Sequence, residues 1–392
     1  MIVFLLVFFA VYGTLNAYCY WKIASALPAR TGVRLALAAA LALMVAAPVL
    51  ARALDSAGVA RLAYVYGFMG YVWLVVVMWI VSFGICFDVW NLACKGLGRW
   101  APGAARLALS PRTTMLALCV IVCTLSIWGV GEAWRIELKQ VRVECPRLPA
   151  GSEPIRIVHV SDIHAGGGVG ERRLRKIMSV VEQARPDVLV CTGDTVDVGS
   201  RNLDALAEIL AAVRAPLGKF AVVGNHEFYH GLEGSLAFLE AAGFRVLRGE
   251  SVLVGGRLRI AGVDDLAGSR MGMPGKTDEN VALPAAETRE ATILLKHRPA
   301  VDPRSPGRFD LQLSGHTHGG QVFPFTLVAR AFWDHPHGLY RLEKGSAINV
   351  SRGAGTWGAP LRVLARPEVV LITLIPPAAG APGEGREGSK AP

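Results

Sequence analysis

Histidine, aspartate and asparagine side chains follow the apolar runs in the second half of this sequence. All nine histidines lie at residue 159 or later, and three fall in "LLKHRP" (294–299) and "SGHTHGGQ" (314–321). Three more apolar runs end in "VSDIHAG", "CTGDTVD" and "VGNHEF". Imidazole, carboxylate and carboxamide groups are the ones with which proteins bind transition metals. Seven side chains are therefore candidate metal ligands: Asp162, His164, Asp194, Asn225, His297, His316 and His318.

The number and mixture of these groups indicate a pair of ions. Mixed nitrogen and oxygen ligands suit Mn²⁺, Fe²⁺ or Zn²⁺ rather than an all-oxygen calcium site. One ion takes about four to six ligands, so seven fit two ions that share a bridging ligand. Two metals about 3.5–4 Å apart can stabilise the attacking and leaving oxygens of a displacement at phosphorus. These residue types thus favour hydrolysis of a phosphoester.

Other polar residues nearby have simpler interpretations. Asp197 and Glu227 each have two candidate roles, which are orienting a metal ligand and capping a turn. Gly193, Gly224 and Gly315 suit tight turns in which backbones approach closely. Four histidines are interpreted as core or loop residues rather than ligands: His159, His230, His335 and His337.

Alternating strands and helices must position the candidate ligands. Apolar, β-branched runs predict strands in "IRIVHVSD", "DVLVCTGD" and "KFAVVGNHE", and helical spacing predicts a helix after each of them. Ligand sites in such parallel sheets form beyond the carboxyl ends of the strands, so the polar clusters should converge. Residues i and i+2 of an extended segment point the same way, which would bring together Asp162 with His164, and His316 with His318.

The chain becomes rich in strands after residue 244. A hairpin is predicted to turn at Gly255 and Gly256, and further strands in "ATILLKH", "DLQLSGH", "SAINVS" and "VVLITL". Residues 266–290 form a long predicted loop between them. The pattern predicts an α/β fold with a two-sheet core and helices outside.

The first 134 residues indicate a membrane domain. They carry nine Lys/Arg and three Asp/Glu, and four runs contain no charge: 1–21, 35–51, 62–87 and 113–131. A bilayer core needs about 17–25 apolar residues as a helix. If the four runs were buried helices of a soluble protein, the first 134 residues would leave almost nothing to cover them. A cleaved signal peptide is disfavoured for the first run, which has no basic segment before it.

Basic residues in the loops predict the orientation of these four spans. The first and third loops hold three and four Lys/Arg against two in the second, so they should face the cytoplasm. The remainder of the chain would then lie outside the cytoplasm. The net charge of +10 comes mostly from these loops and does not indicate nucleic-acid binding.

The motif set as a whole resembles the calcineurin-like metallophosphoesterase superfamily. The order D-x-H, GD, GNHE, H and GHTH is that of the superfamily, and "GHTHGGQ" with "GAGTWGAPLRV" is similar to its membrane-associated bacterial branch. The resemblance covers about residues 155–375 and implies a four-layer α/β/β/α sandwich. Three ligand assignments come with it: Asp162, His164 and His318 on one metal; Asn225, His297 and His316 on the other; Asp194 as the bridge.

The resemblance also implies a mechanism. A hydroxide that bridges the two metals would attack phosphorus, and His226 would stand beside the leaving group as an acid or a transition-state stabiliser. We therefore expect a multi-pass protein of the cell membrane that hydrolyses a phosphoester, with a membrane lipid as one candidate substrate. The alternative is a non-catalytic membrane sensor or scaffold that retains the fold.

The expected organisation has four parts. They are a membrane domain with four transmembrane helices (1–134), a linker with an initial strand (135–154), the metallophosphoesterase domain (155–375) and a disordered tail (376–392). The transmembrane helices are poor in ionisable residues, which argues against a transporter.

Overall fold

The chain divides into two compact units in a computed structural model, which describes residues 2–197, 202–273, 275–285, 288 and 290–378. The helical unit comprises Met1–Glu132, Val322–Phe325 and Gly358–Val363. The sandwich unit comprises Ala133–Gln321, Thr326–Trp357 and Leu364–Pro392. Most of the expected tail, 379–392, lies outside the described residues.

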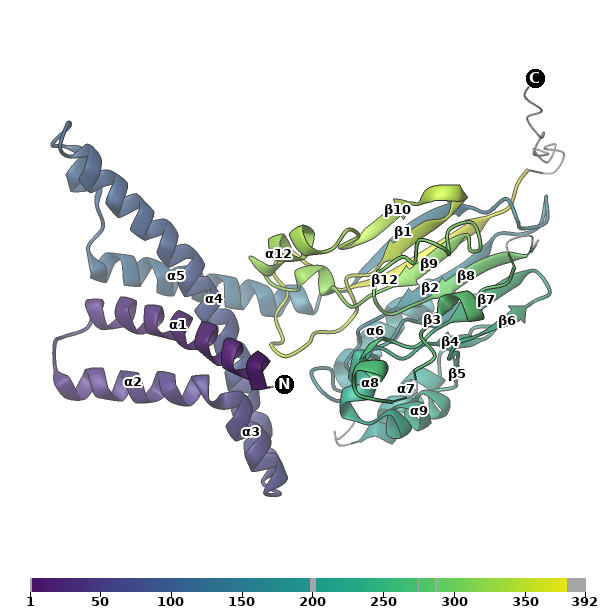
Figure 1. Ribbon diagram of the computed structural model, residues 1–392, viewed down its shortest axis with the longest axis horizontal. Coiled ribbons are helices and arrows are strands. Elements are labelled where there is room, and N and C mark those ends of the chain that lie inside the picture. Colours follow the sequence, from purple (N-terminus) through teal and green to yellow (C-terminus); the bar gives the residue numbers. More distant parts are fainter. Residues whose placement is uncertain (1, 198–201, 274, 286–287, 289, 379–392) are drawn as a thin grey trace. The chain divides into compact units, whose positions relative to one another are not determined.

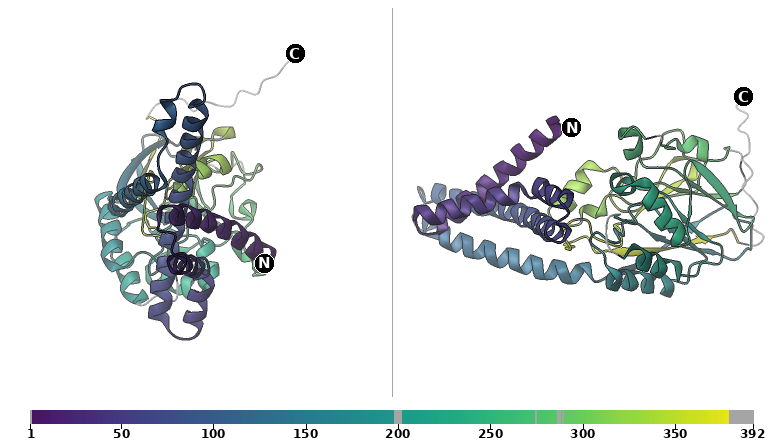
Figure 2. Two further views of the ribbon diagram at one scale, coloured as in Figure 1. Left: turned by 90° about the vertical axis from the view of Figure 1, so that its left-hand side faces the viewer. Right: turned by 90° about the horizontal axis from the view of Figure 1, so that it is seen from below.

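Segments with few charges form the helices of the helical unit, which Figure 2 shows from two directions. Tyr12, Cys19, Val77, Ile80 and Leu118 form a buried cluster between the first, fourth and fifth helices. The helices are α1 (Ile2–Ala26), α2 (Thr31–Val45), α3 (Ala47–Ser56), α4 (Ala60–Leu97) and α5 (Pro111–Ala133).

The expected four spans are only partly supported. In the described residues, α4 and α5 are long and apolar enough to cross a membrane, and α2 with α3 would make a third span if the bent pair counts as one. This pair is bent by 62°. Pro48 lies in the first turn of α3, where it has no N–H and its ring would clash with a continuing helix. The described part of α1 does not meet the same criteria.

The described part of the sandwich unit contains two six-stranded sheets (Figure 1). In the first sheet β2, β3, β4 and β5 are parallel, as predicted for the early strands, and β12 is antiparallel to β2. The strand order of this sheet is β1 (Glu137–Glu144), β12 (Glu368–Ile375), β2 (Ile155–Val160), β3 (Val188–Cys191), β4 (Lys219–Ala221) and β5 (Arg245–Val246).

The second sheet contains the predicted hairpin and the later strands except the last, β12, which lies in the first sheet. Its β7, β8, β9 and β11 are parallel, while β6 and β10 are antiparallel edge strands. The order is β10 (Gly338–Arg341), β11 (Ala347–Val350), β9 (Leu311–Ser314), β8 (Ala291–Leu295), β7 (Leu258–Gly262) and β6 (Glu250–Val254).

Apolar side chains of both sheets meet in one core. Ile157 and Val190 of the first sheet, with Ile293 and Leu313 of the second, are fully buried in it. Burying each such side chain stabilises the fold by about 1.5–3 kcal/mol. The sheets therefore hold their strand ends in fixed positions.

Helices cover the outer face of the first sheet much more fully than that of the second. The cluster on the first sheet includes side chains of α6 (Glu171–Gln183), α7 (Leu203–Ala211) and α9 (Leu232–Ala241). The second sheet is covered by a smaller cluster that includes Ala282 of the four-residue α11 (Glu279–Ala282). The two mixed sheets agree with the expected fold class, while the expected fourth layer is thin in the described residues.

One local prediction was wrong, and one helix was not predicted. The expected strand 219–227 stops at Ala221, because the GNH motif starts a helix, α8 (Asn225–His230). The segment after "GHTHGGQ" contains a helix that the sequence pattern did not indicate, α12 (Phe325–Phe332).

Candidate metal centre

All seven candidate ligands lie in segments that follow the carboxyl ends of strands in the two sheets. Asp162 and His164 follow β2, Asp194 follows β3, and Asn225 follows β4. The second sheet supplies the others: His297 follows β8, and His316 and His318 follow β9. The structure brings all seven side chains together.

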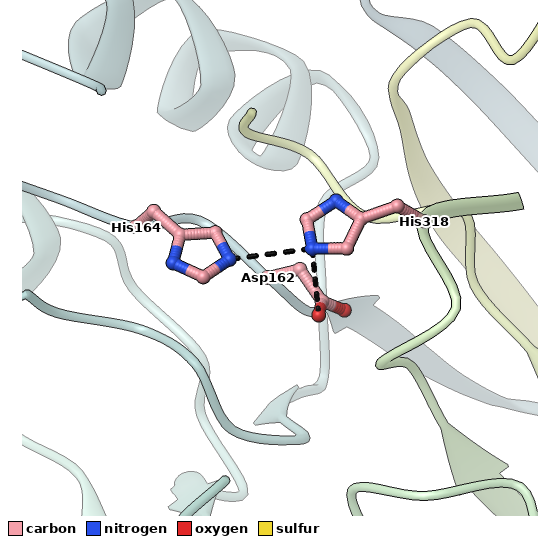
Figure 3. A group of neighbouring side chains, drawn as sticks. All are labelled: Asp162, His164 and His318. Atoms are coloured by element: carbon pink, nitrogen blue, oxygen red, sulfur yellow. Dashed lines mark hydrogen bonds and ion pairs between the residues drawn. The ribbon is translucent and has the colours of Figure 1, made fainter. Parts of the chain in front are cut away.

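One group of ligand atoms consists of Asp162, His164 and His318 (Figure 3). The His318 Nε2 atom lies 3.4 Å from Asp162 Oδ1 and 3.3 Å from His164 Nε2. Asp162 and His164 are fully buried, so this group is held rigidly by the protein around it.

A second group consists of Asp194, His297 and His316, with Asn225 beside it. The His297 Nε2 atom lies 3.3 Å from Asp194 Oδ2, 3.1 Å from His316 Nδ1 and 3.1 Å from Asn225 Oδ1. Asp194 Oδ2 is also 4.0 Å from His164 Nε2 of the first group. Asp194 thus lies between the two groups.

These spacings fit metal ions. A metal–nitrogen bond of about 2.0–2.1 Å places two ligands of one tetrahedral ion roughly 3.4 Å apart. The contacts of 3.3 Å between His164 and His318, and of 3.1 Å between His297 and His316, are close to that value. The donor set is the mixed nitrogen and oxygen set that Mn²⁺, Fe²⁺ and Zn²⁺ favour.

Hydrogen bonds orient two of the imidazoles. His297 Nδ1 lies 2.8 Å from the carbonyl oxygen of Thr192, to which it can donate, and this leaves Nε2 facing Asp194. His164 Nδ1 lies 3.3 Å from Asp197 Oδ1, and its Nε2 faces His318. Such partners hold a histidine in the tautomer that binds a metal.

Five of the seven candidate ligands have a left-handed backbone. A positive φ costs a residue other than glycine about 1–3 kcal/mol, and such strain collects at functional sites. We expected residues i and i+2 to point the same way because they would lie in extended segments. The left-handed turns show that this reason was wrong. His316 joins His297, while His318 joins Asp162. The φ values are 52° for Asp162, 53° for His164, 50° for Asp194, 71° for His316 and 50° for His318.

Two glycines allow the loops to approach closely, as predicted. A Cβ atom on Gly315 would lie 1.9 Å from Ser161 Oγ and 2.2 Å from Asp162 Oδ2. A Cβ atom on Gly224 would lie 2.3 Å from Asp194 Oδ1. Any side chain at either position would displace a candidate ligand.

The buried carboxylates create a site that favours a cation. Burial alone would lower the pKa of His297, but the charges of Asp194 and Asp162 raise it to about 10 when no metal neutralises them. Burial opposes ionisation of Asp194, yet its contacts with His297 hold its pKa well below the ordinary value. Burial and the charge of His297 lower the pKa of His316 to about 3, so this imidazole is neutral and able to coordinate.

His226 lies beside the ligands and is partly exposed. Its Nδ1 atom is 2.9 Å from Asp197 Oδ1, and its backbone N–H donates to Asp194 Oδ1 at 2.9 Å. Burial would lower the pKa of His226, but the hydrogen bond to Asp197 and the charge of Asp194 raise it above its ordinary value. The imidazolium form is therefore favoured at this position.

Asp197 and Glu227, whose roles the sequence left open, both support the site. Asp197 Oδ1 contacts His164, His226 and also His230, whose Nε2 is 3.7 Å away. Asp197 thus links the candidate ligand His164 to the candidate acid His226. His230, which we interpreted as a loop residue, also lies beside Asp197. Glu227 is buried and accepts backbone N–H groups of the loop at Asp194, at 3.0 Å, and of Gly224, at 2.8 Å.

Two aromatic side chains lie beside the site. The ring of Trp357 lies edge-on to that of His226 at 6.1 Å, and the ring of Trp333 lies edge-on to that of His316 at 5.4 Å. Trp357 belongs to a loop about 130 residues from His226 in sequence, so no local pattern pointed to it. The interpretation of His159 as a core residue agrees with its full burial and its 2.8 Å contact with Thr192 Oγ1.

Known proteins with the same motifs identify the family. Residues 155–320, which include all seven candidate ligands and His226, match the family described as calcineurin-like phosphoesterase. An uncharacterised metallophosphoesterase of Aquifex aeolicus is 46% identical over 62% of this chain and 93% of its own length. The chain belongs to the calcineurin-like metallophosphoesterase family.

Two other relatives show the range of the family. An uncharacterised metallophosphoesterase of Campylobacter jejuni is 35% identical over 66% of this chain and 69% of its own. A protein of Danio rerio named transmembrane protein with metallophosphoesterase domain is 34% identical over 67% of this chain and 63% of its own. The predicted resemblance is thus confirmed, and a metallophosphoesterase domain also occurs in a transmembrane relative.

Proposed function

We propose that this protein is a membrane-bound phosphoesterase that uses two divalent metal ions, Mn²⁺, Fe²⁺ or Zn²⁺. The observation that carries the proposal is the pair of ligand groups that share Asp194. Asp162, His164 and His318 would hold one ion. The other ion would be held by Asn225, His297 and His316, and Asp194 would bridge the two.

The bound ions would supply Lewis acidity, which lowers the pKa of water and stabilises charge on the phosphate oxygens. The residues of the chain position and protonate the reacting groups. Asp197 accepts from Nδ1 of His226, so the opposite nitrogen, Nε2, would donate a proton to the departing oxygen. His226 with its raised pKa is suited to this role, and its retention argues against a non-catalytic scaffold.

The membrane location rests on the helical unit. Two described helices are long and apolar enough to span a bilayer, and the predicted four-span topology with an extracytoplasmic catalytic domain completes the proposal. A reporter enzyme that is active only outside the cytoplasm, fused after residue 392, should be active. Activity of a cytoplasmic reporter at that junction would reverse the orientation.

We further propose a lipid-linked phosphoester as the substrate. The α12 helix leaves Leu327, Val328 and Phe332 exposed, with Phe332 82% exposed, although surface helices usually present polar residues. Val322–Phe325, which ends on the first residue of this helix, belongs to the helical unit. Just after α12, Trp333 contacts the ring of His316. The exposed face of α12 is therefore close in sequence to the proposed ligands, and an acyl chain would bind on this face.

The first experiment tests the metal centre in the full-length protein. Metal analysis should give about two transition-metal ions per chain, and Asp194→Asn should lower both metal content and hydrolysis of a nitrophenyl phosphodiester. His335→Gln, which replaces a histidine outside the site, serves as the control and should retain both. Full activity after exhaustive chelation would refute a metal-dependent reaction.

The second experiment tests the lipid substrate. Phe332→Ser should slow hydrolysis of phosphoesters embedded in vesicles while leaving hydrolysis of the soluble diester unchanged, because only the lipid needs the apolar face. Leu253→Ser removes an apolar side chain that is 43% exposed on β6 and is the matched control. Equal effects of Phe332→Ser on both substrates would contradict the lipid assignment and leave the metal centre untouched.

A further inference from the structure

A cavity of about 310 Å³ lies within the helical unit, and none of the proposed metal ligands lines it. It is lined by residues near the end of α1, near the end of α4 and at the start of α5. Lys22 lies four residues before the end of α1, and Thr114 lies three residues after the start of α5. At about 1.5 Å per residue, the cavity is within two turns of these helix ends, at a depth typical of lipid headgroups.

Three charged side chains line the cavity, and two are basic. Lys22 is 7% exposed and forms an ion pair with Asp88, whose other oxygen accepts from Tyr18 at 2.7 Å. An ammonium group has three donors, and among the described residues Asp88 is the only side chain that accepts from Lys22. Lys95 forms no ion pair with any described residue. The cavity therefore has a net positive charge and unused donors.

A buried hydroxyl adds a second, independent observation. Thr114 is 3% exposed, and its Oγ1 atom has no hydrogen-bond partner within the described part of the chain. A buried hydroxyl without a partner is unfavourable, so a ligand that accepts from it would be stabilised. Pro111 and Thr114, both lining the cavity, belong to the first turns of α5, where the helix dipole also favours an anion.

The remaining lining is mostly apolar, with Ser25 and Asn91 as its polar members. Leu92 is 73% exposed and Trp21 is 55% exposed. Both side chains line the cavity and also form part of the outer surface of the helices. A volume of 310 Å³ accommodates a phosphate with a small polar head but not acyl chains. The chains of a bound lipid would therefore run along Trp21 and Leu92.

We propose that this cavity binds the phosphate group of an anionic phospholipid. The lysines and the Thr114 hydroxyl would bind phosphate oxygens, while Asp88 holds Lys22 in place. Basic pockets between membrane helices are known to select anionic headgroups. The inference rests on the membrane location of the helical unit and not on catalysis, so Asp194→Asn protein should bind the lipid as well as the wild type does.

The test measures bound lipid by native mass spectrometry of the full-length protein in detergent, with short-chain phosphatidylglycerol and phosphatidylcholine as probes. The wild type should prefer phosphatidylglycerol. Lys95→Gln should weaken that binding about fivefold, the usual contribution of one basic residue. Arg99→Gln removes a neighbouring basic residue that does not line the cavity and should have no effect.

A second variant separates binding from folding. Thr114→Val keeps the shape and removes only the hydroxyl, so it should weaken phosphatidylglycerol binding several-fold without lowering the melting temperature of the lipid-free protein. Thr124→Val, at an exposed position of α5, is the control. Equal binding of the two lipids, or unchanged preference in both Lys95→Gln and Thr114→Val, would overturn the proposal.

The last arm distinguishes a lipid from a soluble phosphate. Glycerol phosphate and inorganic phosphate are added to lipid-free Asp194→Asn protein, in which the proposed metal centre is impaired, and the melting temperature is followed. Neither phosphate compound should raise the melting temperature more in this protein than in its Lys95→Gln variant, because neither compound supplies acyl chains. A rise that Lys95→Gln abolishes would assign the cavity to a soluble anion and overturn the lipid assignment.

Discussion

At the scale of single residues, Asp197 is the side chain on which the chemistry most depends apart from the ligands. One oxygen of its carboxylate is 2.9 Å from His226 Nδ1 and 3.3 Å from His164 Nδ1. Burial would raise the pKa of Asp197, but these hydrogen bonds hold it well below its ordinary value. Asp197 is thus an anion at working pH, and it favours the protonated form of His226.

Asp197→Asn should move the pH profile of the reaction. The carboxylate raises the pKa of His226, so activity that needs the imidazolium form is lost as pH rises through that raised pKa. Removing the charge lowers the pKa, and the basic limb of kcat should shift to lower pH. The rate should fall about 10–100-fold for poor leaving groups and less for nitrophenol.

The matched control for this change is Asp204→Asn, at an exposed position of α7, which should leave the profile unchanged. Metal content is measured alongside, because Asp197 also contacts His164. A basic limb that stays at the same pH in Asp197→Asn, with metals retained, would show that Asp197 has only a structural role.

At the scale of elements, short strands end in left-handed turns that aim the ligands inward. The turns at Asp162 and His316 are held together by the backbone N–H of His316, which donates to both oxygens of Asp162 at 3.1 Å. This contact joins the loop after β2 to the loop after β9, and so one sheet to the other. Gly315 makes it possible because it leaves the space that Asp162 occupies.

Gly315→Ala should therefore damage one ligand group without unfolding the protein. Its Cβ atom would overlap Asp162 Oδ2, and we expect a loss of metal from the group of Asp162, a fall in kcat of at least about tenfold and a destabilisation of about 1–3 kcal/mol. Gly170→Ala is the control, since no described residue lies within 4 Å of the added atom. Normal metal content in Gly315→Ala would contradict this account of the turn.

At the scale of the whole molecule, the proposed metal ions would cross-link two sheets. Asp162, Asp194 and Asn225 follow strands of the first sheet, whereas His297 and His316 follow strands of the second. An ion bound between them stabilises the folded state by an amount that grows with its concentration, about 2.7 kcal/mol at one hundred times Kd. The metal content and the stability of the sandwich unit should therefore be linked.

Chelation should lower the melting temperature of the sandwich unit, and more so at higher pH. The pKa of His297 is raised to about 10 without metal, so its proton stabilises the metal-free fold fully below about 6.5 and less as pH rises toward 10. Metal binding must displace that proton, so it strengthens over the same range. The difference between loaded and chelated melting temperatures should widen from pH 6.5 to 9, and a constant difference would contradict the role of His297.

Much of this protein was determined by the sequence alone, because the signals were local. Apolar runs with β-branched residues specified most strands, and the polar residues that ended them specified which side chains meet. The uncharged runs predicted α4 and α5. The motif order was sufficient to identify the family, since each motif depends only on a turn and a few neighbouring side chains.

Only the tertiary structure decided how these parts are grouped. His316 and His318 separate into different ligand groups because their backbone is left-handed, and only surrounding contacts can hold a residue in that strained conformation. Asp197 meets His226 across 29 residues of sequence, and Trp357 meets it across many more. Such contacts, like the bend between α2 and α3 and the hydroxyl of Thr114 beside a cavity, depend on packing between distant segments, which no short pattern encodes.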